Sequence, residues 1–358
     1  MADEQPEEKT EPKHEDDNTD VEPEIIRFDN NGDLRLLVSE RTVEGPVPKI
    51  FIVSSKAMSM ACDAWNSMLN GSFRESQPPP SGELREVELP NDDAAALKIS
   101  LNIAHLHFDQ IPSRLEFLTL YKVTVLTDKY DATRLIRPWA RSWTDEYLNY
   151  AEDHGFEEWL WIVWELGMTE IFELTTNSLV TRTGISEHGT LVNIVGRILD
   201  PTENSGLQFP SDVIESITKT RKKVISDLLE ACYSAVDRII EQNDARSIYG
   251  GEFSQCDAMT FGSLCLSLCN IGLGLQRPDA GVVNKTVNDL YWSLGHVRVH
   301  SCKFHAARFT QCPIECVNGG LNAKLQAARD EVHGSISSAI LDVHYRHLGR
   351  QAKKSGIK

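Results

Sequence analysis

The sequence lacks long apolar runs, a secretory signal and any excess of positive charge, and each absence excludes a class of protein. No apolar run approaches the roughly 20 residues of a membrane-spanning helix, and the first residues lack the basic and then apolar pattern of a signal peptide. The 358-residue chain carries a net charge of -17, which disfavours nucleic acid and anionic membranes as partners because both bind concentrated positive surfaces. We therefore expect a protein of the cytoplasm or nucleus without a membrane partner.

Motifs for catalysis are also missing. The sequence contains no phosphate-binding loop, no nucleophile elbow and no His-Glu-x-x-His pair. Gly272 and Gly274 begin like a dinucleotide-binding loop, but Arg277 stands where the third glycine is needed, and the preceding residues have a helical rather than a strand pattern. Scattered polar side chains would have to converge to form an active site, so we predict that the protein is not an enzyme.

The chain begins with an acidic tail, residues 1–24. Asp or Glu occurs at nearly every second position there, and Val21 is the only large apolar residue after the initial methionine. Such a segment cannot bury enough apolar surface to offset the entropy lost on ordering, so we predict a disordered tail. The alternative is a docking arm for a basic partner.

Residues 25–146 combine strand and helix patterns in one α+β segment. Alternating apolar residues predict strands at 33–39, 49–53 and 85–89, and apolar residues three and four apart predict helices at 56–71, 91–107, 118–130 and 133–146. The buried stripe of the helix at 118–130 is expected to contain Leu118, Tyr121, Val125 and Leu126. Pro138 lies inside the last helical pattern, so we expect a kink or a late helix start there.

Several short motifs in this segment follow one another in an order that is typical of one family. They are Asp33-Leu34, Phe51-x-Val-Ser-Ser-Lys56, Trp65-x-x-Met68, Gly71-Ser-Phe73-Arg-Glu75, Leu89-Pro-Asn-Asp-Asp93 and Leu126-Thr-Asp-Lys-Tyr-Asp131. With these motifs, residues 28–143 resemble the BTB/POZ domain in the form common among fungal proteins. The resemblance implies a small sheet with packed helices, and a protein-interaction module that dimerises and recruits a cullin-type ubiquitin ligase or transcriptional cofactors.

The resemblance also assigns roles to individual residues. It places Asp33, Trp65, Met68 and Phe73 in the family's core and interface region, where they are candidate partner-binding residues. Ser54-Ser55 stands where many animal members carry a His-Arg pair, and no counterpart of the exchanged N-terminal helix precedes Asp33. A homodimer and a monomer therefore both stay open, and a ubiquitin-ligase adaptor is one hypothesis beside a plain scaffold.

Beyond Tyr150 the pattern is that of an all-helical region. We predict a helical extension at 150–180, a connector at 181–210, a helical C-terminal region at 211–350 whose final helix spans 322–347, and a basic, frayed tail at 351–358. Trp159 and Trp164 are expected to pack the extension, with a partner groove as the alternative. A long helix after Ser211 is expected to bury Val213, Ile217, Val224, Leu228, Cys232, Val236 and Ile239. Arg221-Lys222-Lys223 on that helix is expected to face solvent, with nucleic acid as the alternative contact.

Five of the eight cysteines lie between Cys265 and Cys316, and these five fall into two kinds. Cys265 and Cys269 have helical spacing inside an apolar run and are expected in the core. The predicted ligands of a structural zinc ion are Cys302, His305, Cys312 and Cys316. Such an ion would hold the last helices together, and no other cofactor is predicted. The alternative is a loop of reduced thiols beside a surface histidine.

A second function class follows from the predicted zinc loop. A zinc-stabilised module that touches nucleic acid would make the chain a transcription or chromatin-associated factor. The basic residues that would support such a contact are Lys285, Arg298, Lys303 and Arg308. The net charge of -17 disfavours this alternative, so a noncatalytic interaction protein with protein partners is our first prediction.

Overall fold

The computed structural model describes residues 23–42, 45–77, 83–153, 155–200, 208–210, 212–248, 255–300 and 320–357. The predicted acidic tail up to residue 22 and the loop with Cys302, His305, Cys312 and Cys316 lie outside the described residues. The chain divides into two compact units, Met1–Gln110 and Ile111–Lys358. The division falls after residue 110, whereas the sequence predicted a first module that continues to residue 146.

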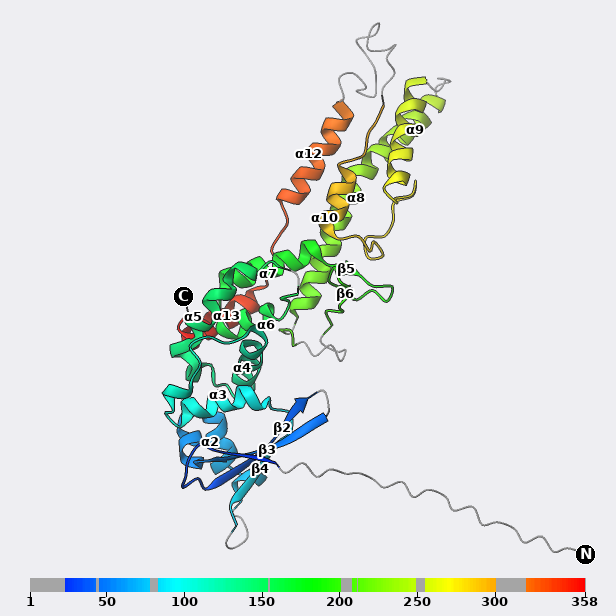
Figure 1. Cartoon of the computed structure of the whole chain (residues 1–358). Coiled ribbons are helices and arrows are strands. Elements are labelled where there is room, and N and C mark those ends of the chain that lie inside the picture. Colours follow the sequence, from blue (N-terminus) through cyan, green and yellow to red (C-terminus); the bar gives the residue numbers. More distant parts are fainter. Residues whose placement is uncertain are drawn as a thin grey trace, which may run out of the picture. The chain divides into compact units, whose positions relative to one another are not determined.

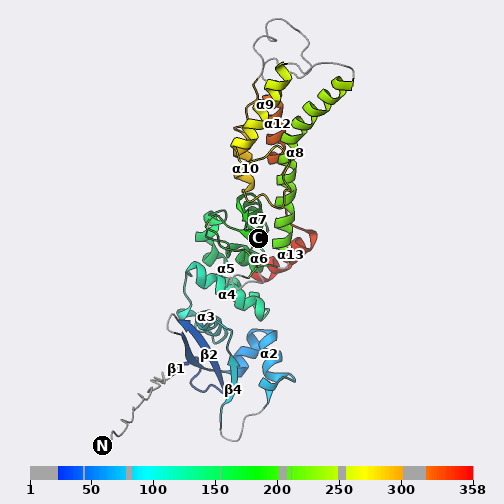
Figure 2. The same cartoon turned by 90° about the vertical axis from the view of Figure 1, so that its right-hand side faces the viewer.

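The N-terminal unit is built on a four-stranded sheet with the strand order β1-β3-β2-β4 (Figures 1 and 2). Its strands are β1 (Glu24–Arg27), β2 (Leu34–Thr42), β3 (Gly45–Val53) and β4 (Arg85–Leu89). β2 and β3 form the predicted antiparallel hairpin, while β1 pairs parallel with β3 and β4 pairs parallel with β2. β1 was not predicted, because four residues with Ile25 and Ile26 adjacent give no alternating pattern.

One face of this sheet supplies the apolar core of the N-terminal unit. Leu34, Leu36 and Val38 are buried at alternate positions of β2, as predicted. Leu36 lies opposite Phe51 of β3 and Val87 of β4. Paired residues on neighbouring strands point to the same side of a sheet, so the strands build one apolar layer. Each fully buried side chain of this size stabilises the fold by about 1.5–3 kcal/mol.

Local capping sets where the helices of this unit begin. The helices are α1 (Ser55–Ala61), α2 (Asp63–Asn70) and α3 (Ala94–Ala104), with short 3-10 turns at η1 (Arg74–Ser76) and η2 (Phe108–Gln110). Ser54 Oγ accepts a hydrogen bond from Ala57 N at 3.3 Å, and Asp93 Oδ1 accepts one from Ala96 N at 3.0 Å. These side chains pair N–H groups that the first helical turn leaves free.

The C-terminal unit is predominantly helical (Figure 1). Its first elements are α4 (Phe117–Lys129), η3 (Thr133–Ile136), α5 (Arg137–Thr144), η4 (Asp145–Tyr150), α6 (Trp159–Leu166), α7 (Thr169–Arg182), β5 (Gly184–Ile185) and β6 (Leu191–Val192). They are followed by α8 (Val213–Ile248), α9 (Gln255–Asn270), α10 (Val287–Leu294), α12 (Gly320–Gly334) and α13 (Asp342–Ser355). Pro138 lies in the first turn of α5, which confirms the late start predicted there. Among the described residues, no helix has both the length and the apolar character to cross a membrane.

Helix α6 is the centre around which the first helices of this unit pack. All 8 of its residues are buried, and α4, α7 and α13 contact it. Trp159 and Trp164 belong to this core, so they pack the fold rather than line an open groove. Gly167 ends α6 with φ 72°, and a Cβ there would lie 2.1 Å from the backbone nitrogen of Ala352 in α13. Glycine is therefore required both by the left-handed conformation and by the close approach of α13.

The C-terminal end of the chain differs from its prediction. Instead of one helix at 322–347 and a frayed tail, the chain forms α12 and then α13, which continues to Ser355. Gln351, Ser355 and Ile357 are buried, and Figures 1 and 2 both show α13 beside α6. The basic composition of this segment suggested a frayed tail, but its buried residues recur at helical spacing. Their packing keeps the end of the chain helical.

Helix α8 carries a second apolar core with α9, α10 and α12. The predicted stripe of α8 is buried at every position, namely Val213, Ile217, Val224, Leu228, Cys232, Val236 and Ile239. Three predictions for single residues are wrong. Cys269 is exposed, although Cys265 is buried as expected, and Leu118 of α4 is 58% exposed at the first turn of its helix. Arg221, expected in solvent, is 0% exposed because its guanidinium pairs with backbone carbonyls.

Candidate functional site

Asp33 and Ser55 form a polar cluster at the start of α1. The Asp33 carboxylate accepts hydrogen bonds from Ser55 N at 2.7 Å and from Ser55 Oγ at 2.6 Å. Burial raises the pKa of Asp33, but the hydrogen bonds from Ser55 outweigh burial and hold this pKa below its usual value. A carboxylate at the N-terminus of a helix is also favoured by the helix dipole. Asp33 therefore caps α1, and both of its oxygens are engaged within the unit.

His105 extends this cluster from the end of α3. Its Nε2 accepts a hydrogen bond from Ser54 N at 2.9 Å, and its Nδ1 lies 2.8 Å from Leu101 O. The neutral ring therefore carries its proton on Nδ1, because Nε2 must stay free to accept. Burial lowers the pKa of His105. The cluster thus joins α1 to α3 through a neutral imidazole.

The other predicted partner-binding residues divide between the core and the surface. Trp65 is 1% exposed and belongs to the core of the N-terminal unit. Met68 is half-buried on α2, and Phe73 is 55% exposed in the turn that follows. Of the four predicted residues, Phe73 is the one that offers most of its apolar surface to a partner.

Met60 of α1 is a second exposed apolar side chain in the N-terminal unit. Met60 is 76% exposed, and its neighbour Ser59 accepts a hydrogen bond from Asn70 Nδ2 at 2.9 Å, which joins the ends of the two helices. Phe73 Cδ2 lies 3.5 Å from the position that a Cβ of Gly71 would take. We call these two exposed side chains of the N-terminal unit, Met60 and Phe73, the apolar patch. Met60 was not predicted, because sequence spacing alone does not show which methionine of a short helix faces solvent.

The C-terminal unit buries an ionisable side chain, Glu165, in the middle of α6. Glu165 is 0% exposed, and its Oε1 accepts hydrogen bonds from Thr127 Oγ1 at 2.9 Å and Thr133 Oγ1 at 2.6 Å. Its Oε2 accepts from Gln351 Nε2 at 2.5 Å. Burial raises the pKa of Glu165 to about 7, and the charge of Asp128 acts in the same direction. One carboxyl group thus joins α4, η3, α6 and α13.

The amide of Gln351 allows the Glu165 site to hold a proton. Its Oε1 is buried and has no hydrogen-bond partner within the part of the chain that the structure describes. Turning the amide over would exchange Nε2 and Oε1, and a protonated Glu165 would then donate to Gln351 Oε1. The signal for this site was in the sequence, where Glu165 is the one charged residue in the apolar run Trp159–Leu166.

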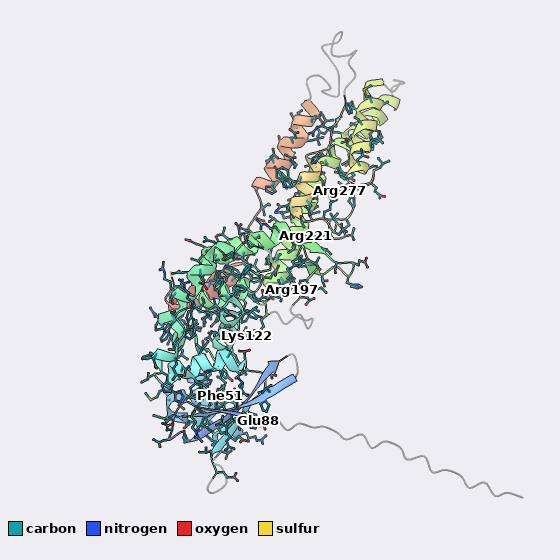
Figure 3. The ribbon with its side chains drawn as sticks, viewed as in Figure 1. Phe51, Glu88, Lys122, Arg197, Arg221 and Arg277 are labelled. Atoms are coloured by element: carbon teal, nitrogen blue, oxygen red, sulfur yellow. The ribbon has the colours of Figure 1, made fainter. Side chains whose placement is uncertain are left out.

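Arg221 is a buried positive charge on α8 (Figure 3). Its Nε donates to Thr183 O at 2.9 Å, and its Nη2 donates to Val283 O at 3.0 Å and to Lys285 O at 2.7 Å. Burial lowers its pKa to about 10, so the guanidinium stays charged at neutral pH. The side chain therefore ties α8 to the end of α7 and to the segment before α10.

Two glutamates and one arginine form a further cluster at the start of α6. Glu157 and Glu158 are each 5% exposed. Arg197, labelled in Figure 3, lies between them, with Nη2 at 2.9 Å from Glu158 Oε1 and Nη1 at 3.7 Å from Glu157 Oε2. Asn193 Nδ2 donates to Glu157 Oε1 at 2.8 Å. A small pocket beside them is lined by Glu157, Asn193 and Thr175, among other residues. These contacts fasten the turn around Arg197 to α6.

The predicted zinc ligands cannot be placed in this description, because Cys302, His305, Cys312 and Cys316 lie outside the described residues. Within the described ranges, no three His, Cys, Asp or Glu side chains are grouped so that they could hold a metal ion. The zinc site, and the nucleic-acid function that depends on it, therefore stay predictions.

Comparison of the chain with protein-family models, with curated proteins and with solved structures finds no match. The resemblance of residues 28–143 to the BTB/POZ domain thus depends on the sequence motifs between Asp33 and Asp131. The functional argument consequently begins from the side chains that the N-terminal unit exposes.

Proposed function

We propose that the N-terminal unit is a noncatalytic protein-interaction module and that the chain acts as an adaptor or scaffold. The observation that carries this proposal is the apolar patch, in which Met60 is 76% and Phe73 is 55% exposed. Covering a side chain of either kind contributes about 1.5–3 kcal/mol, and Met and Phe are enriched in protein interfaces. The BTB/POZ resemblance and the lack of catalytic motifs in the sequence support the same function.

The resemblance names two partners for this surface, a second copy of the chain and a cullin-type ubiquitin-ligase subunit. A homodimer would bring two copies of the apolar patch together around a two-fold axis. A cullin would cover one copy of the patch with apolar side chains of its own. Both partners require that Met60 and Phe73 become buried on binding.

The proposal is tested by removing the apolar surface and leaving the core intact. Light scattering on the full chain would measure its oligomeric state, and a titration with a cullin N-terminal fragment would measure binding. We expect Met60→Ser with Phe73→Ser to weaken the association about tenfold or more, since about 1.4 kcal/mol corresponds to a factor of ten. Leu174→Ser is the matched control, because Leu174 is 46% exposed on α7 in the C-terminal unit.

The outcomes separate the proposal from its alternatives. Circular dichroism should show the same fold for all variants, because the substituted side chains are exposed. A monomeric wild-type chain that does not bind the cullin fragment would contradict both proposed partners. Association that survives the double substitution unchanged would show that the apolar patch is not the interface.

A further inference from the structure

Five basic residues lie on α13, η3 and α5, which pack together in the C-terminal unit. They are Arg134, Arg137, Arg350, Lys353 and Lys354, and we call them the basic face. Arg134 and Arg137 are three residues apart, and Arg350 is followed by Lys353 and Lys354 three and four residues on. Residues at these spacings lie on one side of a helix. The basic face therefore combines one side of each of two neighbouring segments.

Contacts between the two segments hold the basic face together. α13 packs against both η3 and α5. Arg137 Nη1 donates to the carbonyl of Lys353 at 3.4 Å, and a Cβ on Gly356 would lie 2.6 Å from Arg137 Nε. Lys354 Nζ reaches Asp131 Oδ1 at 2.5 Å, just before η3. The backbone after Arg350 thus runs directly beside Arg137 of α5 and packs against η3, which carries Arg134.

Most of this positive charge has no counter-charge. Lys354 pairs with Asp131, but no carboxylate lies within ion-pair distance of Arg134, Arg137, Arg350 or Lys353 among the described residues. These four side chains are exposed. The local field is strong enough to act on a neighbour: burial first, then Arg350 and Lys354, lower the pKa of His347 to about 4.

An unpaired basic cluster is unexpected in a chain with 53 acidic and 36 basic residues. Because acidic residues outnumber basic ones, basic residues placed at random on the surface would more often have acidic neighbours. Basic side chains held close together also repel one another, which destabilises the folded chain. Three of the five side chains are arginines, whose guanidinium groups donate two parallel hydrogen bonds to one carboxylate. The cluster therefore has the chemistry of a carboxylate receptor.

We propose that the basic face binds an acidic, Asp- or Glu-rich segment of a partner protein. α13 has 14 residues and is about 21 Å long, which matches an extended peptide of about six residues. A short acidic segment would interact with the local positive field, because charges farther away than about 8 Å are screened at physiological salt. A long nucleic acid would also meet the rest of a chain whose net charge is -17.

Fluorescence anisotropy on the full chain tests this assignment. The probe is a short dye-labelled peptide of alternating Asp and Ser, and a short oligo(dT) strand of similar charge is the second probe. We expect the peptide to bind at about 50 mM salt and to weaken strongly at about 300 mM, as screening shortens the range of the field. Arg134→Glu with Lys353→Glu should lower the peptide affinity about tenfold or more.

The matched control is Lys219→Glu with Lys223→Glu, which changes the net charge equally on exposed positions of α8. We expect this control to change the affinity less than about twofold, because its charges lie outside the basic face. Arg134→Lys should give an intermediate loss, since it keeps the charge and removes the forked donor. Circular dichroism would establish that each variant is folded.

Three outcomes would overturn the proposal. The first is a wild-type chain that does not bind the peptide at low salt. The second is an equal loss in both double variants, which would reveal a general charge effect. The third is oligo(dT) that binds as tightly as the peptide and is released by Arg134→Glu with Lys353→Glu, which would assign the face to nucleic acid.

Discussion

The two compact units place their polar side chains in different ways. In the N-terminal unit, Asp33 and His105 lie at the margin of the core, where they cap α1 and join it to α3. In the C-terminal unit, Glu165 and Arg221 are fully buried, and neither has an oppositely charged partner among the described residues. Asp33 and His105 therefore cap α1 and join it to α3 at the margin of a core, whereas Glu165 and Arg221 hold helices together from inside a core.

Two of these groups, His105 and Glu165, make opposite contributions to the pH dependence of stability. Burial lowers the pKa of His105 from 6.5, so the unfolded state binds more protons at this residue and acid removes the stabilisation that His105 provides. Burial raises the pKa of Glu165 from 4.5 to about 7, so the folded state binds more protons at this residue and base removes the stabilisation that Glu165 provides. The following substitutions test this comparison, in order of decreasing expected effect.

The largest effect is expected from Arg221→Met. The substitution removes the donors for Thr183 O, Val283 O and Lys285 O and leaves these carbonyls in a buried site. Leaving buried polar partners unpaired costs about 1–3 kcal/mol each, so we expect the free energy of unfolding to fall by about 3–5 kcal/mol. Denaturant unfolding of the full chain, with hydrogen exchange to locate the loss, would measure it.

Lys223→Met is the control for this substitution, because Lys223 lies two residues away on the exposed side of α8. It should change the free energy of unfolding by less than about 0.5 kcal/mol. Hydrogen exchange should show the loss from Arg221→Met in α7, α8 and α10, with the N-terminal unit unchanged. Equal stability of the two variants would mean that the buried arginine is not a bridge within the core.

The contrast between the units also explains how much the sequence could predict. The β2–β3 hairpin, β4 and the stripe of α8 were predictable because each follows a single periodicity, with Leu34, Leu36 and Val38 at alternate positions and Val224 and Leu228 one helical turn apart. The periodicity of apolar residues predicted these elements correctly because one face of each of them is buried.

Polar residues escaped prediction, because their burial depends on partners far away in the sequence. Arg221 is buried by carbonyls at Thr183 and Lys285, and Gln351 is buried by Glu165 on another helix. No local pattern reports such contacts. Long-range packing also decides which of the predicted partner-binding residues are buried. Trp65 lies in the core and Phe73 lies on the surface, and their spacing in the sequence does not distinguish the two.

A smaller effect is expected from Glu165→Gln, which tests the contribution of Glu165 to the pH dependence of stability. In the wild-type chain, the stability from Glu165 is fully present below pH 4.5 and is lost as pH rises through about 7, up to about 3 kcal/mol. The substituted glutamine would keep the hydrogen bonds, since its oxygen accepts from Thr127 and Thr133 and its amide donates to a turned Gln351. The variant should therefore lose this pH dependence.

Hydrogen exchange in the full chain, corrected for the chemical exchange rate, would measure this effect in peptides from α6 and α13 between about pH 5 and pH 8. Glu170→Gln is the control, because Glu170 is exposed on the neighbouring helix α7. It should retain the wild-type pH dependence. Identical pH slopes for Glu165→Gln and the wild type would show that Glu165 does not titrate with folding.

The smallest effect is expected from His105→Gln, which tests the opposite contribution of His105 in the N-terminal unit. His105 is partly exposed, so solvent screens part of its contribution. Its stabilisation is present above pH 6.5 and is lost as pH falls below 6.5 towards the lowered folded pKa, because protonated Nε2 cannot accept from Ser54 N. Once hydrogen exchange is corrected for the chemical exchange rate, peptides from α1 and α3 of the wild type should therefore show weaker protection in acid.

His105→Gln should make this exchange independent of pH in the same range, since the glutamine oxygen can accept from Ser54 N and carries no titrating proton. His107→Gln is the control, because it removes a neighbouring imidazole whose ring centroid lies 6.2 Å from that of His105. If the loss of protection in acid persisted in His105→Gln and disappeared in His107→Gln, His105 would not be the residue responsible for it. The two units would then still differ in where their polar groups lie, but the opposite contributions of His105 and Glu165 would not follow from that difference.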